Sequence, residues 1–173
     1  MNSIPNPEEC IELLKQSGCS EEVIGHCKAV RDVAVRMAER ANADVKLVEA
    51  GALLHDIGRS KTHGIHHLVE GARIAKELGL PDSIIRIIER HIGAGLPSEN
   101  ARKLGLPEKN YMPETLEEKI VCHSDNLIDD GEKQKIESEV EKVLAKGLDD
   151  YARRLVALHK ELSDICGVYV NNI

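Results

Sequence analysis

The residues of this 173-residue chain that could do chemistry are histidines on the apolar sides of predicted helices. Three of the eight histidines, His26, His67 and His91, fall on the apolar stripes of three separate helical segments. Taken singly, an inward histidine is more often a hydrogen-bonded core residue than a metal ligand. We interpret His159 in that structural way, because no carboxylate occupies a comparable position near it. The case for chemistry therefore depends on the whole set.

Two carboxylates accompany these imidazoles. Asp125 shares a helix face with apolar residues, and a carboxylate rarely enters a core unless it is paired or binds a cation. His55 and Asp56 close another predicted helix, directly before Ile57-Gly58, where the chain must turn. Four imidazoles and two carboxylates cannot easily satisfy one another in a dry core without a metal ion. Nitrogen and oxygen ligands without thiolate suit Mn, Fe, Co, Ni, Zn or Mg, so one or two such divalent ions are expected.

Other polar residues near these positions are expected to be structural or exposed to solvent. Cys27 and Cys122 flank candidate ligands, and we interpret both as small buried hydrophobic residues. His123 is two residues from Asp125 and off its helix face, which indicates a position behind the ligands or on the surface. Loop or helix-surface positions are predicted for His63, His66, Asp129 and Asp130.

The elements that must position these side chains are helices. Apolar residues recur at three and four positions almost throughout, whereas strictly alternating β-branched runs are absent. This pattern predicts an all-α helical bundle with helices over 7–17, 20–41, 44–57, 66–78, 81–92, 98–104, 113–130, 132–146 and 148–165. The length of the chain and its 42% hydrophobic residues indicate a single domain over 1–173.

Composition excludes several classes of function. With 30 acidic and 23 basic side chains the net charge is −7, and aromatic residues make up only 2%, so non-specific nucleic acid binding is not expected. No apolar run is long enough to span a membrane. The five cysteines include no C-x-x-C pair, which favours reduced thiols and a cytoplasmic protein. The partly apolar tail 168–173 packs either on the core or across a dimer, so a homo-oligomer stays open.

In this order, His26, His55-Asp56-Ile57-Gly58 and Asp125 resemble the H…HD…D signature of the HD-domain superfamily of metal-dependent phosphohydrolases, in its HDIG form. The resemblance implies the HD-type helical bundle, with a metal-binding core over 20–130 and an accessory helical segment over 132–173. It also implies that His26, His55, Asp56 and Asp125 hold one metal. His67 and His91 resemble the two extra histidines of members with a binuclear centre, in which Asp56 would bridge to the second metal.

The chain departs from the family pattern at two positions. Many HDIG proteins have Lys after the glycine, and here Arg59 keeps the charge but replaces a point cation by a planar fork. We predict that Arg59 contacts phosphate and acts with Asp56 in catalysis. Related proteins often read His-His or His-His-Glu at the position of His91, which stands alone here. The loop 93–95 is expected at the mouth of the site.

The resemblance implies a small hydrolase that acts on a phosphate ester, such as a nucleotide or a related phosphorylated metabolite. Two divalent ions would hold a phosphoryl oxygen and generate a hydroxide that attacks phosphorus. Two alternatives remain open at this point. One is a non-catalytic HD module that binds metal and a nucleotide, and the other is a di-iron oxygenase of the HD fold.

Overall fold

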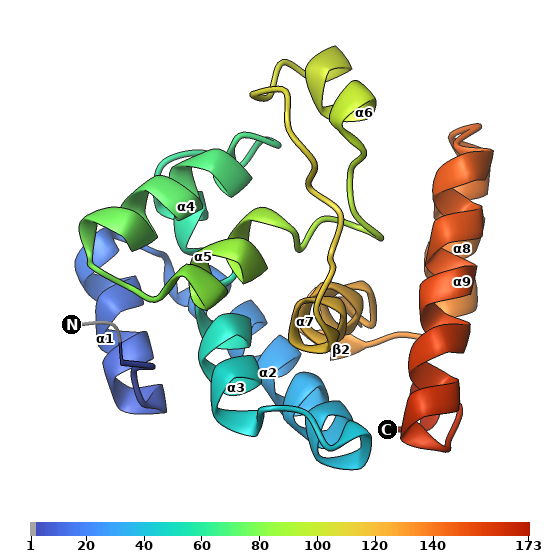
Figure 1. Cartoon of the computed structure of the whole chain (residues 1–173), viewed down its shortest axis with the longest axis horizontal. Coiled ribbons are helices and arrows are strands. Elements are labelled where there is room, and N and C mark those ends of the chain that lie inside the picture. The colour runs from blue at the N-terminus through green and yellow to red at the C-terminus, as the bar shows by residue number, and fades with distance from the viewer. Residues whose placement is uncertain (1–2) are drawn as a thin grey trace.

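The computed structural model describes residues 3–173 and is built almost entirely from helices (Figure 1). The predicted all-α fold is therefore confirmed. The α-helices are α1 (Pro7–Ser17), α2 (Glu21–Ala41), α3 (Val45–Leu54), α4 (His67–Glu77), α5 (Asp82–Glu89), α6 (Ser98–Lys103), α7 (Leu116–Asn126), α8 (Ile136–Ala145) and α9 (Asp149–Cys166). Two 3-10 helices, η1 (Ile57–Ser60) and η2 (Val170–Asn172), and two short strands, β1 (Ile128–Asp129) and β2 (Glu132–Lys133), complete the described elements.

Side-chain caps determine where several of these helices begin. The hydroxyl of Ser20 accepts a hydrogen bond from the backbone amide of Val23, so α2 begins one residue later than predicted. Thr115 and Glu118 form a capping box at the start of α7, where each side chain accepts a hydrogen bond from the other residue's backbone amide. The cap moves the start of α7 three residues inward from the predicted position.

The predicted helix over 113–130 is wrong beyond residue 126, because the chain forms a hairpin there. β1 and β2 pair antiparallel, with Ile128 opposite Lys133. The two residues between the strands, Asp130 and Gly131, have φ angles of 50° and 76°. Positive φ at both central positions is the geometry of the type I′ turn, for which Asp-Gly is a favoured sequence. Asp129 and Asp130 therefore lie in a hairpin and not on a helix surface.

The hydrophobic core consists of two main clusters, and α3 contributes to both. One cluster joins α3 to α2, α7, α8 and α9, with Val30, Met37, Ile120 and Leu155 among its buried residues. The other joins α3 to α1, α4, α5 and the first turns of α2. The C-terminal tail packs on the first cluster, since Val170 is fully buried there and Ile173 packs against it. Of the two placements expected for the tail, the structure has the one on the chain's own core.

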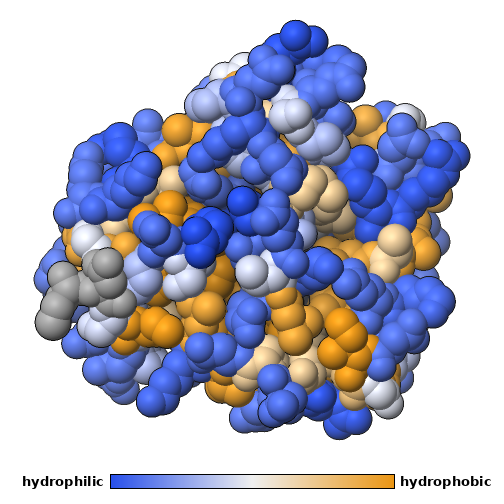
Figure 2. Space-filling view, in the orientation of Figure 1, coloured by the Kyte–Doolittle hydropathy of each residue, from blue (hydrophilic) through white to orange (hydrophobic). Residues whose placement is uncertain are grey.

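Polar side chains cover much of the face seen in Figure 2, and hydrophobic side chains reach that face in patches between them. Charged residues make up 31% of the chain, which accounts for this cover. Within residues 3–173, every helix is too short or too polar to span a lipid bilayer.

Candidate metal centre

The six predicted ligands come from five places in the chain that the fold brings together. His26 lies in the second turn of α2 and Asp125 in the last turn of α7. The other four stand at or just beyond helix ends, with His55 and Asp56 after α3, His67 at the start of α4 and His91 after α5. Helix ends lack the intrahelical hydrogen bonds of helix interiors, so these four side chains are aimed by local backbone contacts.

His26, His55 and Asp125 form the first donor group. Their potential ligand atoms all lie within 4.8 Å of one another. Nε2 of His26 is 2.9 Å from Oδ1 of Asp125, and Nε2 of His55 is 3.5 Å from the same oxygen. Two imidazole nitrogens and a carboxylate oxygen therefore converge on one point.

Asp56, His67 and His91 form a second donor group beside the first, and all three are buried. The two Nε2 atoms of His67 and His91 are 3.1 Å apart. Oδ1 of Asp56 lies 3.3 Å from the first and 3.2 Å from the second.

Asp56 lies between the two donor groups and offers one oxygen to each. Its Oδ1 atom faces His67 and His91, whereas its Oδ2 atom lies 3.5 Å from Nε2 of both His26 and His55. A carboxylate in this position can bind one cation through each oxygen. The resemblance implies a bridging role for Asp56, and this role stays a prediction.

Three of the imidazoles are oriented in the same way, through the ring nitrogen that faces away from the centre. In each, Nδ1 lies 2.6–2.8 Å from the backbone carbonyl oxygen three residues earlier in the chain. Because a carbonyl only accepts, Nδ1 carries a proton in each ring, and Nε2 is the nitrogen that faces the centre and can bind a metal ion when the ring is neutral. The three pairs are His55 with Ala52, His67 with Gly64, and His91 with Ile88.

The donor set fits a divalent cation on two observations. Nε2 of His55 and Oδ1 of Asp56 are buried and have no hydrogen-bond partner among the described residues. With protons on Nδ1, the neutral rings of His67 and His91 direct two lone pairs at each other across 3.1 Å. A cation between them would satisfy both nitrogens and Oδ1 of Asp56, and a cation in the first donor group would satisfy Nε2 of His55.

Charges of opposite sign lie close together in the centre. Burial opposes the charged form of both His55 and Asp56, but their mutual attraction and the hydrogen bonds from neighbouring side chains together outweigh it. As a result the pKa of His55 is well above its usual value, and that of Asp56 is well below its usual value. Burial opposes the charge of Asp125 as well, but hydrogen bonds from His26 and His55 lower its pKa. Burial lowers the pKa of His91 and keeps it neutral, the form that binds metals.

Gly58 explains why a glycine follows the His-Asp pair. A Cβ atom at this position would lie 1.9 Å from the carbonyl oxygen of His67 and 2.6 Å from the amide nitrogen of Gly71. The 3-10 helix η1 therefore packs directly against the backbone of α4. This close approach places His67 beside Asp56.

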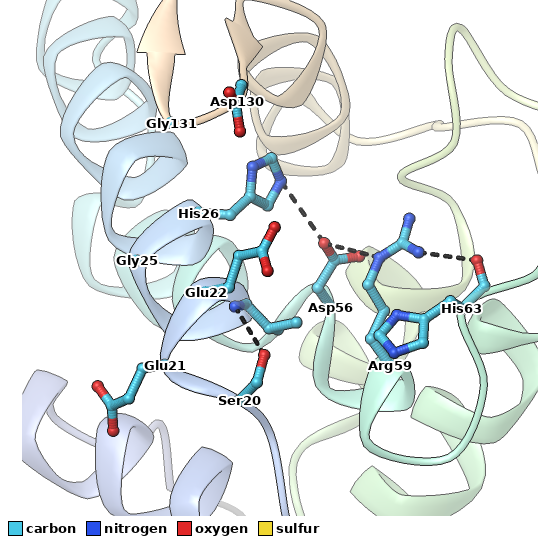
Figure 3. A pocket seen from close by; sticks show the side chains of 11 residues that line it. Ser20, Glu21, Glu22, Gly25, His26, Asp56, Arg59, His63, Asp130 and Gly131 are labelled. Carbon is cyan, nitrogen blue, oxygen red and sulfur yellow. Dashed lines mark hydrogen bonds and ion pairs between the residues drawn. The ribbon is translucent and has the colours of Figure 1, made fainter.

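Arg59 lies next to the centre. Its Nε atom is 3.1 Å from Oδ2 of Asp56, and its guanidinium donates a hydrogen bond to the carbonyl oxygen of His63 (Figure 3). The side chain is about a quarter exposed. Arg59 thus keeps a positive charge at the edge of the donor groups, where an anion would arrive.

A cavity of about 670 Å³ opens onto His26, Asp56 and Arg59. Its remaining lining residues are Ser20, Glu21, Glu22, Val23, Gly25, His63, Asp130 and Gly131. Sequence reasoning missed Glu22, His63 and Asp130 as residues of the site. The Asp-Gly pair is a hairpin signal that would have placed Asp130 in a turn.

The structure places three neighbours that the sequence analysis considered. Of the two positions expected for His123, it has the buried one: the ring is fully buried, and its Nε2 atom is 2.7 Å from Nδ1 of His159, so the two rings form a pair outside both donor groups. His63 lies in an exposed loop, as expected, and it also lines the cavity. The loop 93–95 does not line this cavity, since Gly93 packs against Tyr151 of α9 and accepts a hydrogen bond from Asn126.

The cysteines are placed as the sequence predicts. Cys27 and Cys122 are fully buried, and burial raises the pKa of both thiols. The sulfur of Cys27 also lies within 4.8 Å of ligand atoms of His55 and Asp56. A protonated thiol is a poor ligand, so Cys27 acts as packing behind the centre.

A family model described as HD domain matches residues 23–129 of the chain. Among curated proteins, a tRNA (cytidine(56)-2'-O)-methyltransferase of Thermoplasma volcanium is 48% identical over 170 residues, which are 98% of this chain and 50% of that protein. The chain thus spans about half the length of this relative. An uncharacterized protein of Methanocaldococcus jannaschii is 45% identical over 166 residues, which are 91% of this chain and 97% of that protein.

Among solved structures, the HD domain of the L. monocytogenes phosphodiesterase PgpH matches with a TM-score of 0.63 and 19% identity. The match covers 94% of this chain and 96% of that domain. The same domain in complex with cyclic-di-AMP matches with a TM-score of 0.59 and 18% identity, over 91% of this chain and 96% of that domain. At this identity the likeness shows a common fold.

Proposed function

The chain belongs to the HD-domain family, and from that premise we propose that it is a phosphohydrolase that depends on one or two divalent metal ions. The observation that supports this best is Asp56, whose two oxygens face two separate groups of buried donors. A structural ion site has no need for two adjacent groups that share a carboxylate and open onto a cavity.

In this proposal His26, His55, Asp56 and Asp125 hold one ion, and Asp56, His67 and His91 hold the other. When bound, such ions offset the charge of a phosphate group and lower the pKa of nearby water, which favours hydrolysis of a phosphate ester. Mn, Fe, Co, Ni, Zn and Mg all suit these donors. The ligands lie within 20–130, and we propose that the segment 132–173 supports them from outside, through the packing of Tyr151 on Gly93.

The chain's own charges determine how a phosphate ester would lie in the cavity. The guanidinium of Arg59 can donate to two phosphate oxygens at once, whereas Asp56 would repel them. The phosphate group therefore lies beside Arg59, and the rest of the substrate lies in the wider cavity. The Nδ1 protons of His55, His67 and His91 are donated to backbone carbonyl oxygens, so none of these Nδ1 protons is free for a leaving group.

We propose a small phosphorylated molecule as the substrate, such as a nucleotide or a related metabolite. A cavity of about 670 Å³ is within the usual range for small-molecule sites, roughly 300–1,000 Å³. The complex of the PgpH domain with cyclic-di-AMP concerns that protein, but it favours nucleotides among the compounds to be tried here. The five unpaired cysteines favour a cytoplasmic location.

A second candidate function follows from the methyltransferase relative. Because this chain matches only half of that protein, the named methyl transfer can belong to the other half. The part of the chain that the structure describes would then be a metal-binding module that accompanies a tRNA-modifying enzyme.

Metal-loaded protein and a panel of phosphate mono- and diesters separate these candidates. The purified chain is stripped with a chelator, reloaded with each of the six metals, and assayed for release of phosphate or alcohol. We expect metal-dependent hydrolysis that Asp56→Ala abolishes and that Asp129→Ala, a change in an exposed carboxylate paired with Lys142, leaves intact. Tight metal binding without hydrolysis of any ester would favour the module. Uptake of oxygen by the iron-loaded protein would favour an oxygenase.

A further inference from the structure

The cavity above the metal centre has the guanidinium of Arg59 on one wall and two carboxylates on the other (Figure 3). Arg59 and His63 line one side, and Glu22 and Asp130 lie on the other, on either side of His26. Asp56 lies between the two walls. The two acidic residues come from segments about one hundred positions apart, the first turn of α2 and the turn of the β1–β2 hairpin.

The carboxylates of Glu22 and Asp130 make no ion pair or side-chain hydrogen bond with any other residue that the structure describes. Nearby acidic residues differ in this respect, because Asp129 in the same hairpin pairs with Lys142 and Asp32 on the same helix pairs with Arg31. The negative charge of Glu22 and Asp130 is therefore not offset by a neighbouring side chain, and it acts on whatever enters the cavity.

The buried end of the cavity fixes which part of a substrate meets these carboxylates. Oδ1 of Asp56 is buried without a hydrogen-bond partner, and Arg59 contacts the other oxygen of the same carboxylate. A phosphate is drawn to this end by Arg59 and by the cations that the donor groups would hold. The rest of the substrate then extends toward Glu22 and Asp130.

We propose that Glu22 and Asp130 select substrates with a single phosphate group on an uncharged body rich in hydroxyl or amino donors. This inference rests on the proposed function. Carboxylate oxygens accept hydrogen bonds from hydroxyl pairs, such as those of a ribose, and from amino groups. The same oxygens repel a second or third phosphate group, so nucleoside triphosphates and polynucleotide chains bind poorly.

A simpler role for each residue can be tested separately. An acidic residue in the first turn stabilises a helix, and Glu22 occupies such a position in α2. Aspartate also suits the positive φ of 50° at Asp130. The variant Asp130→Asn keeps this turn preference and removes the charge, and Glu22→Gln keeps the size of the side chain. A purely structural role would alter the melting temperature and leave selectivity unchanged.

The test compares adenosine 5′-monophosphate with adenosine 5′-triphosphate as probes. For the metal-loaded wild-type protein we expect a higher kcat/KM with the monophosphate. In the double variant Glu22→Gln/Asp130→Asn the ratio of the two kcat/KM values should fall about tenfold at low ionic strength, because two carboxylate charges near the added phosphates are removed. The monophosphate should lose activity while the triphosphate gains it.

A matched control removes the same charge elsewhere. Glu39→Gln/Asp129→Asn changes one exposed carboxylate near the far end of α2 and one in the hairpin outside the cavity. This control should keep the wild-type ratio. Binding of non-hydrolysable methylene analogues of the two nucleotides, measured by titration calorimetry, gives a second readout that does not require turnover. The difference between wild type and double variant should shrink as salt screens the charges.

The outcomes separate the two proposals. If the wild-type protein hydrolyses a phosphate ester but the double variant keeps its ratio and its binding constants, the role of Glu22 and Asp130 is refuted and the proposed function stands. If no ester is hydrolysed, the proposed function fails. The ratio of the binding constants of the two analogues, measured by calorimetry, then still decides whether the cavity selects against polyanions. An equal change of the ratio in the control would mean that overall charge, not the cavity wall, sets selectivity.

Discussion

Replacing Gly58 by alanine should damage the second donor group while sparing the first. The new methyl carbon would lie 1.9 Å from the carbonyl oxygen of His67, whereas carbon and oxygen in contact need about 3.3 Å. The backbone of α4 must therefore retreat by about 1.4 Å. Ligand distances at a metal tolerate about 0.2 Å. His67 should thus no longer share an ion with His91 and Asp56.

The same substitution should lower stability. Overpacking a close-packed interior costs about 1–3 kcal/mol, and the upper end is expected here because both obstructing atoms belong to the backbone. For a chain of this length about 3 kcal/mol corresponds to a fall in melting temperature of roughly 6–12 °C. Thermal unfolding of the metal-free protein, followed by circular dichroism, measures this cost without any contribution from bound ions.

The metal content after saturation with Mn or Ni and removal of excess ions completes the test. We expect Gly58→Ala to bind about one ion fewer per chain than wild type. Gly25→Ala is the matched control, because a Cβ atom there meets nothing within 4 Å and alanine favours the interior of α2. This control should keep its ions and melt at the same or a higher temperature. A Gly58→Ala protein with wild-type metal content and melting temperature would refute the steric reasoning.

Three further predictions concern single side chains. His91→Ala should leave His26, His55 and Asp125 able to hold one ion, so elemental analysis should show a reduced but not a zero metal content; wild-type content would remove His91 from the ligands. Arg59→Ala should keep its metal but lower kcat/KM for a phosphate ester by about ten- to a hundredfold, because a charged hydrogen bond contributes roughly 1.5–3 kcal/mol. Arg59→Lys should restore part of this activity. Unchanged kinetics would exclude a phosphate contact. Burial and the nearby charge of His159 lower the pKa of His123 to about 3, against about 6.5 in an unfolded chain. Between these two pKa values the unfolded state binds a proton at this histidine and the folded state does not. The free energy of unfolding therefore falls by up to about 1.4 kcal/mol for each unit by which the pH is lowered. Urea unfolding of His123→Gln between pH 7 and pH 4 should show a weaker dependence than wild type, and equal slopes would contradict the low pKa.

The helical fold and the convergence of the six predicted ligands could be read from the sequence because both depend on local patterns. Apolar residues at helical spacing define the buried side of each helix, and His26 and Asp125 lie on such sides. The motif from His55 to Gly58 also predicts a turn directly after His55 and Asp56. These features predict which side chains point inward, and inward side chains of a small bundle meet.

The wall of the cavity could not be predicted in the same way. Asp130 follows Asp125 closely in the sequence, and a continued helix would have carried it to the surface. The positive φ angles of Asp130 and Gly131 instead fold the chain back over the first turn of α2. Glu22 could not be predicted either, because an acidic residue in the first turn of a helix is common for structural reasons alone. Only the structure shows that it lies beside His26. The pairing of His123 with His159 joins two helices far apart in sequence and leaves no local signal.

The carbonyl partners of His55, His67 and His91 have a consequence for the order of events in assembly. Each ring is held by an oxygen only three residues earlier, so its direction is built into a short stretch of backbone and is set as soon as that turn forms. The metal site is then preorganised, and a cation that binds there needs to reorient few side chains. In a zinc finger the metal drives folding, whereas this protein would bind its ions after it has folded. One metal could then be exchanged for another as their supply changes.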